Sequence, residues 1–392
     1  MVFRGLLFKV RGCLYYRLEC FELWGTIDRL LMDETEMWPQ NKLTDLLAIK
    51  HPIIQAPMAG SSTPALAGAV SNDGGLGSLG CAAMSLDVLT ATTDELRAIT
   101  DQPFNLNFFA HAEPNDRPEI NARLHSQLAS TYRERGITEP PTSANSAYAP
   151  FDQEKITALL KIKPKVVSFH FGLPAAELVT ELREAGCVIL CSATTVAEAE
   201  VLANSDVDAI IAQGWEAGGH RGTFDVSFED FGIGTMALVP QIVDAVDLPV
   251  IAAGGIADGR GIAAAFNLGA SGVQIGSAFL SCPEASISDA HRAAVRNARD
   301  NDTRLTRAFS GRPARAKNNR YIESMAEHRT KFADFPLMYN FSRPLMQSSA
   351  DNNDTDFSFL LYGQATALNR ELPASELFSK LVEEAQNLLP PC

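Results

Sequence analysis

From Leu43 onward, apolar and polar residues follow a regular pattern along the chain. Short runs of β-branched and other apolar residues alternate with longer stretches in which apolar residues recur at helical spacing. The short runs predict eight strands, at residues 52–57, 75–80, 104–109, 166–171, 188–193, 209–214, 249–254 and 272–277. The stretches between them predict helices at 63–72, 85–99, 152–160, 174–185, 195–204, 235–246 and 258–268. Several of these helices open with Ser, Thr or Asp, which favour the N-cap position.

This alternation of strand and helix indicates a parallel sheet with right-handed crossovers. Eight such units favour an α/β fold of the (β/α)8 TIM barrel type over an open, doubly wound sheet. We therefore assign residues 43–283 to a barrel.

Three stretches lie outside this pattern. Residues 110–151 form a long insertion after the third strand, with a polar helical segment at 120–135, and such an insertion often shapes a substrate entrance. After Pro283 the alternation stops, so residues 284–392 predict a smaller helical region that caps the substrate side of the barrel and contains no second sheet. Residues 1–42 show neither helical nor strand period, and we expect an N-terminal extension without regular structure.

Composition narrows the classes of partner. A formal net charge of −14 disfavours nucleic acid and anionic membrane surfaces as partners, because both attract basic patches, and favours a small-molecule substrate. Seven scattered cysteines with no Cys-x-x-Cys pair are typical of a reduced, cytoplasmic protein. No apolar stretch is long enough to span a bilayer. The sequence leaves open whether the protein is a monomer or a homodimer.

Candidate chemistry is expected at one face, because the active sites of such barrels lie at the carboxyl ends of the strands. The sixth strand leads into Gln213-Gly-Trp-Glu-Ala-Gly-Gly-His-Arg-Gly222, whose four glycines let the main chain approach a ligand closely. The other strands carry polar or flexible residues at or near the same ends: Gln55-Ala-Pro-Met-Ala-Gly60, Asn105, Asn107, His170, Gly254-Gly255 and Gly276-Ser277. Backbone amides of the last two turns suit a phosphate group.

Other kinds of site are disfavoured. The chain has no Gly-x-x-x-x-Gly-Lys-Ser/Thr phosphate loop, and the glycines of residues 254–261 have the wrong spacing for a dinucleotide fingerprint. The remaining histidines show no metal-ligand spacing with carboxylates, so no metal site is predicted. Glu216 is at least as readily an ion-paired loop residue as a general base.

Four motifs in order resemble those of the nitronate monooxygenases, FMN enzymes formerly called 2-nitropropane dioxygenases. The motifs are Gln55–Gly60, Ser168–Pro174, Gln213–Gly222 and Ala252–Gly261. The Phe-His-Phe-Gly-Leu-Pro form of the second motif resembles the class I branch, which acts on propionate 3-nitronate. Phe309-Ser-Gly-Arg-Pro-Ala-Arg315 and Tyr362-Gly-Gln364 also fit, so the resemblance runs from about Leu43 into the C-terminal region.

The resemblance implies that FMN lies across the barrel mouth. The residues implied near its ring and ribityl chain are Ala56, Pro57, Met58, Asn107, Gln213, Gly218 and Gly219. Those implied at its phosphate are Gly254, Gly255, Gly276 and Ser277, with Gln274 and Ile275 close by. Glycine amides suit this role, because an unhindered backbone can direct several N–H groups at one anion.

The resemblance also implies catalytic roles for two histidines. His220 corresponds to a histidine over the reactive edge of the flavin. There an imidazole with a pKa near ~6.5 can accept the α-proton of a nitroalkane or help to hold a nitronate. His170 is expected to donate a hydrogen bond to the nitro group. For either residue the alternative is a buried histidine with a purely structural hydrogen bond.

Substrate contacts are implied in the C-terminal region, where residues 335–343 resemble a segment in which two tyrosines and a lysine face the substrate. Tyr339 keeps its type, while Phe335 and Arg343 stand at the other two positions. Arginine can bind a carboxylate through two parallel hydrogen bonds. Tyr339 and Arg343 are therefore expected to contact an anionic substrate.

Together, these features predict oxidative denitrification of alkyl nitronates such as propionate 3-nitronate, with O2 as co-substrate and a carbonyl compound and nitrite as products. The nearer alternative is an NAD(P)H-dependent FMN barrel reductase for an enoyl thioester or a quinone. The farther alternatives are a flavin-binding protein without turnover and a barrel whose glycine loops are only tight turns.

Overall fold

The computed structural model describes residues 6–10, 13–17, 41–142, 148–225, 231–326 and 332–389. The chain divides into two compact units, residues 1–40 with 391–392 and residues 41–390. In the first unit, β1 (Leu6–Val10) and β2 (Cys13–Arg17) form an antiparallel pair. The expectation of an extension without regular structure was therefore wrong for these strands. Both runs are rich in strand-forming residues, and two residues separate them, the commonest length of a hairpin connection.

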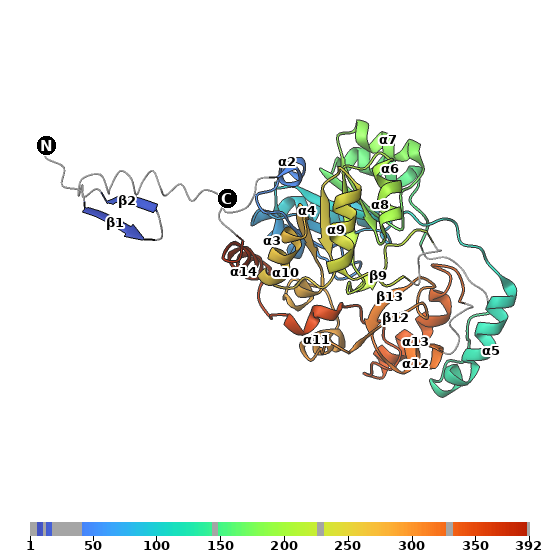
Figure 1. The fold of residues 1–392 in the computed structure, drawn as a ribbon. Coiled ribbons are helices and arrows are strands. Elements are labelled where there is room, and N and C mark those ends of the chain that lie inside the picture. Colours follow the sequence, from blue (N-terminus) through green and yellow to red (C-terminus); the bar gives the residue numbers. More distant parts are fainter. Residues whose placement is uncertain are drawn as a thin grey trace. The chain divides into compact units, whose positions relative to one another are not determined.

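Eight parallel strands form the centre of the second unit, in the order β3-β11-β10-β8-β7-β6-β5-β4 (Figure 1). Their bounds are β3 Ile53–Gln55, β4 Gly77–Gly80, β5 Phe104–Phe109, β6 Val166–His170, β7 Val188–Ala193, β8 Ala209–Gln213, β10 Val250–Ala253 and β11 Gly272–Ile275. The first and last strands of this order are joined by a parallel bridge between Ile54 and Leu76, and Gln55 N donates to Leu76 O at 3.0 Å. The sheet is closed, which confirms the predicted barrel and its eight strands.

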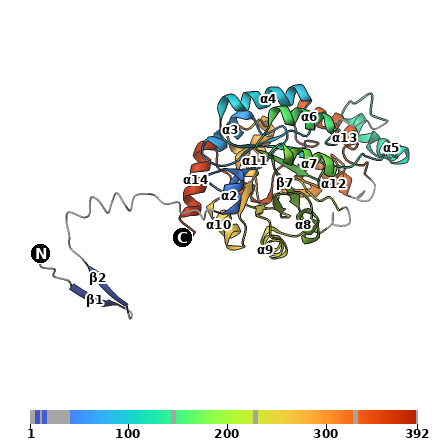
Figure 2. The ribbon, with the colours of Figure 1, turned by 90° about the horizontal axis from the view of Figure 1, so that it is seen from above.

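Helices surround the barrel (Figure 2). Those that match the predicted helices are α3 Pro64–Asn72, α4 Leu86–Ile99, α6 Gln153–Ile162, α7 Ala176–Glu184, α8 Val196–Ala203, α9 Thr235–Ala245 and α10 Gly259–Asn267. The side chains of Thr63, Ser85, Asp152 and Thr195 each accept a backbone N–H in the first turn of the helix that follows. These short-range hydrogen bonds explain why the helix starts could be predicted from the sequence.

The last helix, α14 (Ala374–Gln386), completes the outer layer of the barrel. It was predicted as part of the capping region, but it packs against α10 and α3, as both ribbon views show (Figure 1 and Figure 2). The chain thus leaves the barrel after β11 and returns to it at α14. The helical pattern of α14 shows which of its faces is apolar, but not whether that face packs against the barrel or the cap.

A short helix closes the amino-terminal end of the barrel. In α2 (Lys42–Leu47), Leu43 and Leu47 are fully buried in one cluster with inward-facing strand residues such as Ile211 and Ile251. Asn41 caps α2 and also donates from Nδ2 to Ser271 O at 2.8 Å. Because this end is filled by side chains, the barrel is open to a ligand only at the carboxyl ends of its strands.

Two segments far apart in the sequence form a cap with its own core. Helix α5 (Pro118–Glu134), in the insertion after β5, contributes one apolar stripe, and residues 308–357 contribute the rest. Figure 1 shows α5 beside α12 (Arg320–Ala326) and α13 (Tyr339–Asp351). The shared core contains Ile120, Leu124, Leu128, Tyr132, Phe309, Tyr321, Phe341, Leu345 and Phe357.

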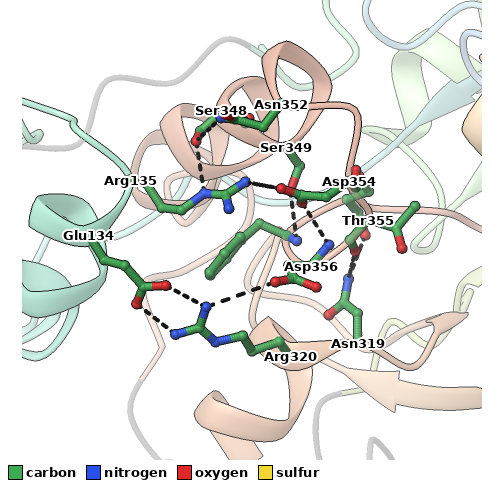
Figure 3. Close-up of polar contacts among 12 residues, drawn as sticks. Glu134, Arg135, Asn319, Arg320, Ser348, Ser349, Asn352, Asp354, Thr355 and Asp356 are labelled. Atoms are coloured by element: carbon green, nitrogen blue, oxygen red, sulfur yellow. Dashed lines mark hydrogen bonds and ion pairs between the residues drawn. The ribbon is translucent and has the colours of Figure 1, made fainter.

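Polar contacts fix α5 to the rest of the cap (Figure 3). Arg135, directly after α5, donates to Asp354 at 2.6 Å and to Ser348 Oγ at 2.9 Å. Glu134 pairs with Arg320 of α12 at 2.6 Å. The Phe357 ring lies near both guanidinium groups, 5.0 Å from that of Arg135 and 5.7 Å from that of Arg320.

The expectation that residues 284–392 contain no sheet was wrong. Strands β12 (Thr303–Thr306) and β13 (Ala314–Lys317) pair antiparallel, and β13 also pairs with β9 (Gly219–His220) of the glycine-rich loop. The runs Thr-Arg-Leu-Thr and Ala-Arg-Ala-Lys carry little apolar signal. Their pairing is set by the partner strand, so it could not be read from periodicity. The 3-10 helix η2 (Ser277–Ser281) directly follows β11, and this region also contains α11 (Asp289–Arg296) and the 3-10 helix η3 (Gln364–Leu368).

Within the described residues, no helix combines the length and the apolar character needed to cross a membrane.

Candidate active site

A cavity of about 370 Å³ lies where the carboxyl ends of the barrel strands meet the cap, a size typical of small-molecule sites. Of the residues predicted from the sequence, those that line it are Ala56, Pro57, Met58, Asn107, His170, Gln213, Gly218, Gly219, His220, Gly254, Gly255, Gln274, Gly276, Ser277 and Tyr339. Ile275 and Arg343 do not line it. Ile275 is fully buried next to Gln274 on β11, and neighbouring strand residues face opposite sides. Arg343 is exposed on α13.

Strand pairing and two side-chain donors place the backbone of His220. It lies opposite Ala314 in the antiparallel pair of β9 and β13. Its carbonyl oxygen accepts from Gln213 Nε2 and from His170 Nε2, each at 3.0 Å. The barrel and the cap therefore hold the same residue from two sides.

The imidazole of His220 lies among aromatic rings and is neutral at ordinary pH. Its ring centroid is 5.6 to 6.2 Å from those of Phe335, Phe171, Phe359 and Phe109, which come from four different segments. Burial, together with the smaller effects of His170 and Arg312, lowers the pKa of His220 to about 3. Nε2 lies 2.8 Å from Ser310 Oγ.

Both ring nitrogens of His170 form hydrogen bonds within the protein. Because a carbonyl oxygen only accepts, Nε2 carries the proton donated to His220 O, and Nδ1 accepts from Ser192 Oγ at 3.0 Å. Burial lowers the pKa of His170 to about 4. A hydrogen bond from His170 to a nitro group, as expected from the sequence, would require one of these two bonds to break.

The side-chain amides of Gln213 and Asn107 also form hydrogen bonds within the protein. Gln213 donates to His220 O and accepts from Gly222 N at 2.7 Å, so its side chain braces the glycine-rich loop. Asn107 Nδ2 donates to Ser168 Oγ at 2.9 Å, while its Oδ1 has no hydrogen-bond partner among the described residues. Of these two amides, only that of Asn107 therefore keeps an unused acceptor at the cavity wall.

At the β10 and β11 side of the cavity, several backbone N–H groups have no acceptor among the described residues. They belong to Gly255, Ile256 and Ser277. Gly254 and Gly255 have φ values of 103° and 74°, the left-handed region that disfavours other residues. Ser277 Oγ accepts from Gly363 N at 2.9 Å and keeps its own hydrogen for another acceptor. These donors can converge on an anion.

Glu216 is a helix cap. Its carboxylate accepts from Thr235 N and from Thr235 Oγ1, each at 2.9 Å, at the start of α9. The N-cap position of that helix is Gly234, which offers no side chain. Both carboxylate oxygens of Glu216 accept the Thr235 N–H, so neither the general-base nor the ion-pair interpretation of this residue is needed.

Two buried residues that the sequence did not single out hold the glycine-rich loop. Arg315 donates from Nη2 to Trp215 O at 2.7 Å, at the start of the loop. The carboxylate of Glu198 accepts from Thr223 Oγ1 and Phe224 N, each at 2.7 Å, just after the end of the loop. Glu198 also accepts from Thr194 N and Oγ1 at the start of α8, which a local pattern could suggest, but no local signal could have shown its contact with the distant loop.

The cap side of the cavity is aromatic. Tyr148, from the insertion, lines the cavity and stacks on Tyr339 at a centroid distance of 5.4 Å. Burial raises the pKa of both phenols, and the charge of Arg343 acts against this rise. Sequence reasoning missed Tyr148, although its place in a long loop after a barrel strand was a signal.

Among the residues that the structure describes, no group of three or more His, Cys, Asp or Glu side chains could hold a metal ion.

Comparison with known proteins gives consistent results. Residues 40–384 match the family model described as nitronate monooxygenase. A nitronate monooxygenase of Paraburkholderia phytofirmans is 44% identical over 353 residues, 89% of this chain and 96% of that protein. The solved structure of a nitroalkane oxidase from Streptomyces ansochromogenes is 38% identical, with a TM-score of 0.80, covering 89% of this chain and 99% of that chain. FabK from Thermotoga maritima is 29% identical, with a TM-score of 0.68, covering 89% and 96%.

Proposed function

The chain belongs to the nitronate monooxygenase family and is an oxidoreductase, and from this premise we propose that it oxidises alkyl nitronates of the propionate 3-nitronate type with O2 to a carbonyl compound and nitrite. One observation carries the proposal. A single cavity places the neutral imidazole of His220, the aromatic cap side chains and a group of unengaged backbone N–H donors around one space.

We propose FMN as the cofactor, because the polar groups of the cavity fit it. The N–H groups of Gly255, Ile256 and Ser277 offer several donors to a phosphate. Gln274 Oε1 is buried in the cavity wall with no donor among the described residues, and Asn107 Oδ1 also has none, so both can accept from a flavin N–H or a ribityl hydroxyl. When bound, FMN would take electrons from the nitronate and deliver them to O2.

The protein's own groups prepare and shield the substrate. His220, neutral at pH 7, can accept the α-proton of a nitroalkane, so that the C–H electron pair stays on the substrate as its nitronate. Phe109, Phe359 and Leu361 give the cavity wall an apolar surface beside His220. Such a surface excludes water and strengthens the electrostatic contacts within.

Recognition of a carboxylate on the substrate would rely on Arg343 at the rim. Arg343 lies one turn after Tyr339 on α13, and its charge reaches the phenols of Tyr148 and Tyr339. No Lys or Arg side chain lines the cavity within the part of the chain that the structure describes. A dianionic substrate is therefore expected to place its nitronate inside the cavity and its carboxylate toward this rim.

The test is a visible spectrum of the purified protein, followed by anaerobic addition of propionate 3-nitronate and NADPH separately. The proposal predicts flavin absorbance that changes with the nitronate and not with NADPH, and nitrite release when air is admitted. Reduction by NADPH alone would assign the protein to the reductase alternative. Colourless protein that releases no flavin on denaturation would reject the cofactor.

A further inference from the structure

Ser310 is the side chain of the cap that touches the ring of His220 through a hydrogen bond. It is 1% exposed and belongs to the 309–315 motif, between β12 and β13. Its Oγ lies 2.8 Å from His220 Nε2, 3.2 Å from Arg312 O and 3.3 Å from Arg312 N. The Ser310 hydroxyl has three partners but can donate only one hydrogen. The partner that receives this hydrogen determines which ring nitrogen of His220 carries the proton.

Two arrangements of the hydrogens are possible, and they differ in how many bonds they complete. If the Ser310 hydroxyl donates to Arg312 O, then Oγ accepts both Arg312 N–H and His220 Nε2–H, and all three contacts are hydrogen bonds. If the hydroxyl donates to Nε2, Arg312 O loses this donor and the proton of His220 moves to Nδ1. Nδ1 has no partner among the described residues. The first arrangement completes more buried hydrogen bonds and is favoured.

The lone pair on Nδ1 then opens on the cavity. His220 lines the cavity, and Nδ1 is not among the fully enclosed polar atoms that lack a hydrogen-bond partner. Four aromatic rings surround the imidazole and Ser310 contacts its Nε2, so the ring has little freedom to turn its other edge inward. One nitrogen faces the cap serine and the other faces the ligand space.

We propose that Ser310 is a positioning residue that holds His220 as its Nε2–H tautomer and thereby presents Nδ1 as the proton acceptor. The inference rests on the proposed function, since it concerns how a neutral nitroalkane becomes a nitronate. The α-C–H bond breaks, its electron pair stays on the substrate as the nitronate, and the proton forms a new N–H bond at Nδ1. The resulting imidazolium keeps its Nε2–H directed at Ser310 Oγ.

This hydrogen bond gains strength as the reaction proceeds. Burial among aromatic rings such as Phe171 and Phe335, and the charge of Arg312, disfavour a cation at His220. With its own hydrogen committed to Arg312 O, Ser310 presents a lone pair to Nε2–H, and a hydrogen bond from a charged donor is about twice as strong as a neutral one. The serine thus stabilises the protonated state more than the neutral one, which is the requirement for assisting proton transfer.

The direct test is the tautomer of His220, observed by long-range 1H–15N NMR correlation on protein labelled with 15N-histidine. With seven histidines in the chain, the His220 signals can be assigned by their loss in His220→Asn. The proposal predicts a protonated Nε2 and an unprotonated Nδ1. The opposite tautomer would overturn it, and this readout does not depend on turnover.

The kinetic test compares neutral nitroethane with preformed ethyl nitronate in Ser310→Ala. We expect kcat/KM for nitroethane to fall by roughly 10- to 100-fold, with a larger primary isotope effect for α-deuterated nitroethane, because proton transfer becomes slower. Activity on the nitronate should stay within about threefold, since that substrate has already lost its proton. Ser310→Thr, which keeps the hydroxyl, should recover most of the lost activity.

The matched control is Ser349→Ala, which removes another fully buried cap hydroxyl, one that bonds to Asp354 and Phe357 and not to His220. Ser349→Ala should change kcat/KM for nitroethane and for ethyl nitronate by the same factor. Equal losses on nitroethane and ethyl nitronate in Ser310→Ala would show that Ser310 is only structural. If the wild-type protein turns over neither nitronate nor nitroalkane, the proposed function fails, while the NMR result still decides the tautomer.

Discussion

At the scale of the residue, the polar side chains of the site act largely on one another. Gln213 and His170 both donate to the carbonyl oxygen of His220, and Ser310 bonds to its ring. The position of His220 is therefore set by neighbours from two barrel strands and the cap. Preorganisation of this kind allows a catalytic group to act without rearrangement.

Replacement of His220 by Asn tests its role as a base. His220→Asn should lower kcat/KM for neutral nitroethane by about 10²- to 10⁴-fold, the usual contribution of a general base. Much of the activity on ethyl nitronate should remain, because that substrate needs no proton transfer. Nitrite release measures both reactions, and an equal loss on both would contradict proton abstraction by His220.

Replacement of Gly255 by Leu tests the predicted phosphate position. Gly255 has a φ of 74°, and an added Cβ would lie 3.3 Å from Glu216 Cβ beside the free N–H groups. We expect Gly255→Leu to lose most of its flavin during purification, measured as flavin released per protein on denaturation. The control is Gly136→Leu, which has a similar φ of 70° and no neighbouring atom within 4 Å. Unchanged flavin content in Gly255→Leu would place the phosphate elsewhere.

At the scale of the element, insertions after two strands build the cap, and the cap builds part of the site. Helix α5 and residues 308–357 share one core, and β13 pairs with β9, which carries His220. Loss of cap packing should therefore reach the active site through this pair of strands. The ion pairs of Arg135 with Asp354 and of Arg320 with Glu134, drawn in Figure 3, are polar contacts of this packing.

Arg135 and Arg320 provide a matched pair for measuring how α5 is held. Arg135 is 13% exposed and its partner Asp354 is 30% exposed, whereas Arg320 and Glu134 are 50% and 48% exposed. Arg135→Met should lower the free energy of unfolding by about 1–3 kcal/mol, because Oδ2 of the partly buried Asp354 carboxylate loses its guanidinium donor. Arg320→Met should change stability little, since exposed ion pairs are weak. Guanidinium unfolding measures both, and equal effects would contradict the assignment of α5 docking to Arg135.

At the scale of the whole molecule, the closed barrel and the cap enclose the candidate active site between them. The chain leaves the barrel after β11, forms most of the cap and returns through α14 to the barrel surface. This path connects distant parts of the sequence, so cap and barrel are expected to unfold together. Buried histidines lie in both parts.

Acid should destabilise the protein well before its carboxylates are protonated. Burial lowers the pKa of His51, His111 and His170 to about 4 and that of His220 to about 3. Above pH ~6.5 both the folded and the unfolded chain keep these groups neutral. As the pH falls below that value, the unfolded chain binds protons first, so the free energy of unfolding falls by about 1.4 kcal/mol per pH unit for each histidine.

The measurement is chemical unfolding between about pH 7 and 5, where the carboxylates remain ionised. His51 does not line the cavity, and His51→Gln should reduce the pH dependence by the contribution of one histidine. Constant stability across this range would show that the histidines are not held neutral in the folded state.

The sequence by itself determined the eight strands, the helices between them and most of the cavity lining. Strand and helix periods reflect which side chains are buried, and caps such as Ser85 and Asp152 bond within their own helices, so local sequence carries this information. The carboxyl ends of parallel strands converge, so residues as distant as Met58 and Ser277 could be assigned to one site without a structure.

Only the tertiary structure decided which distant segments meet. It paired β13 with β9, placed α14 on the barrel, brought Tyr148 and Ser310 to the site, and left the exposed Arg343 and the buried Ile275 outside the cavity lining. These outcomes depend on packing between residues far apart in the chain. A periodic pattern indicates that a side chain is buried, but it does not indicate which distant residue the side chain packs against.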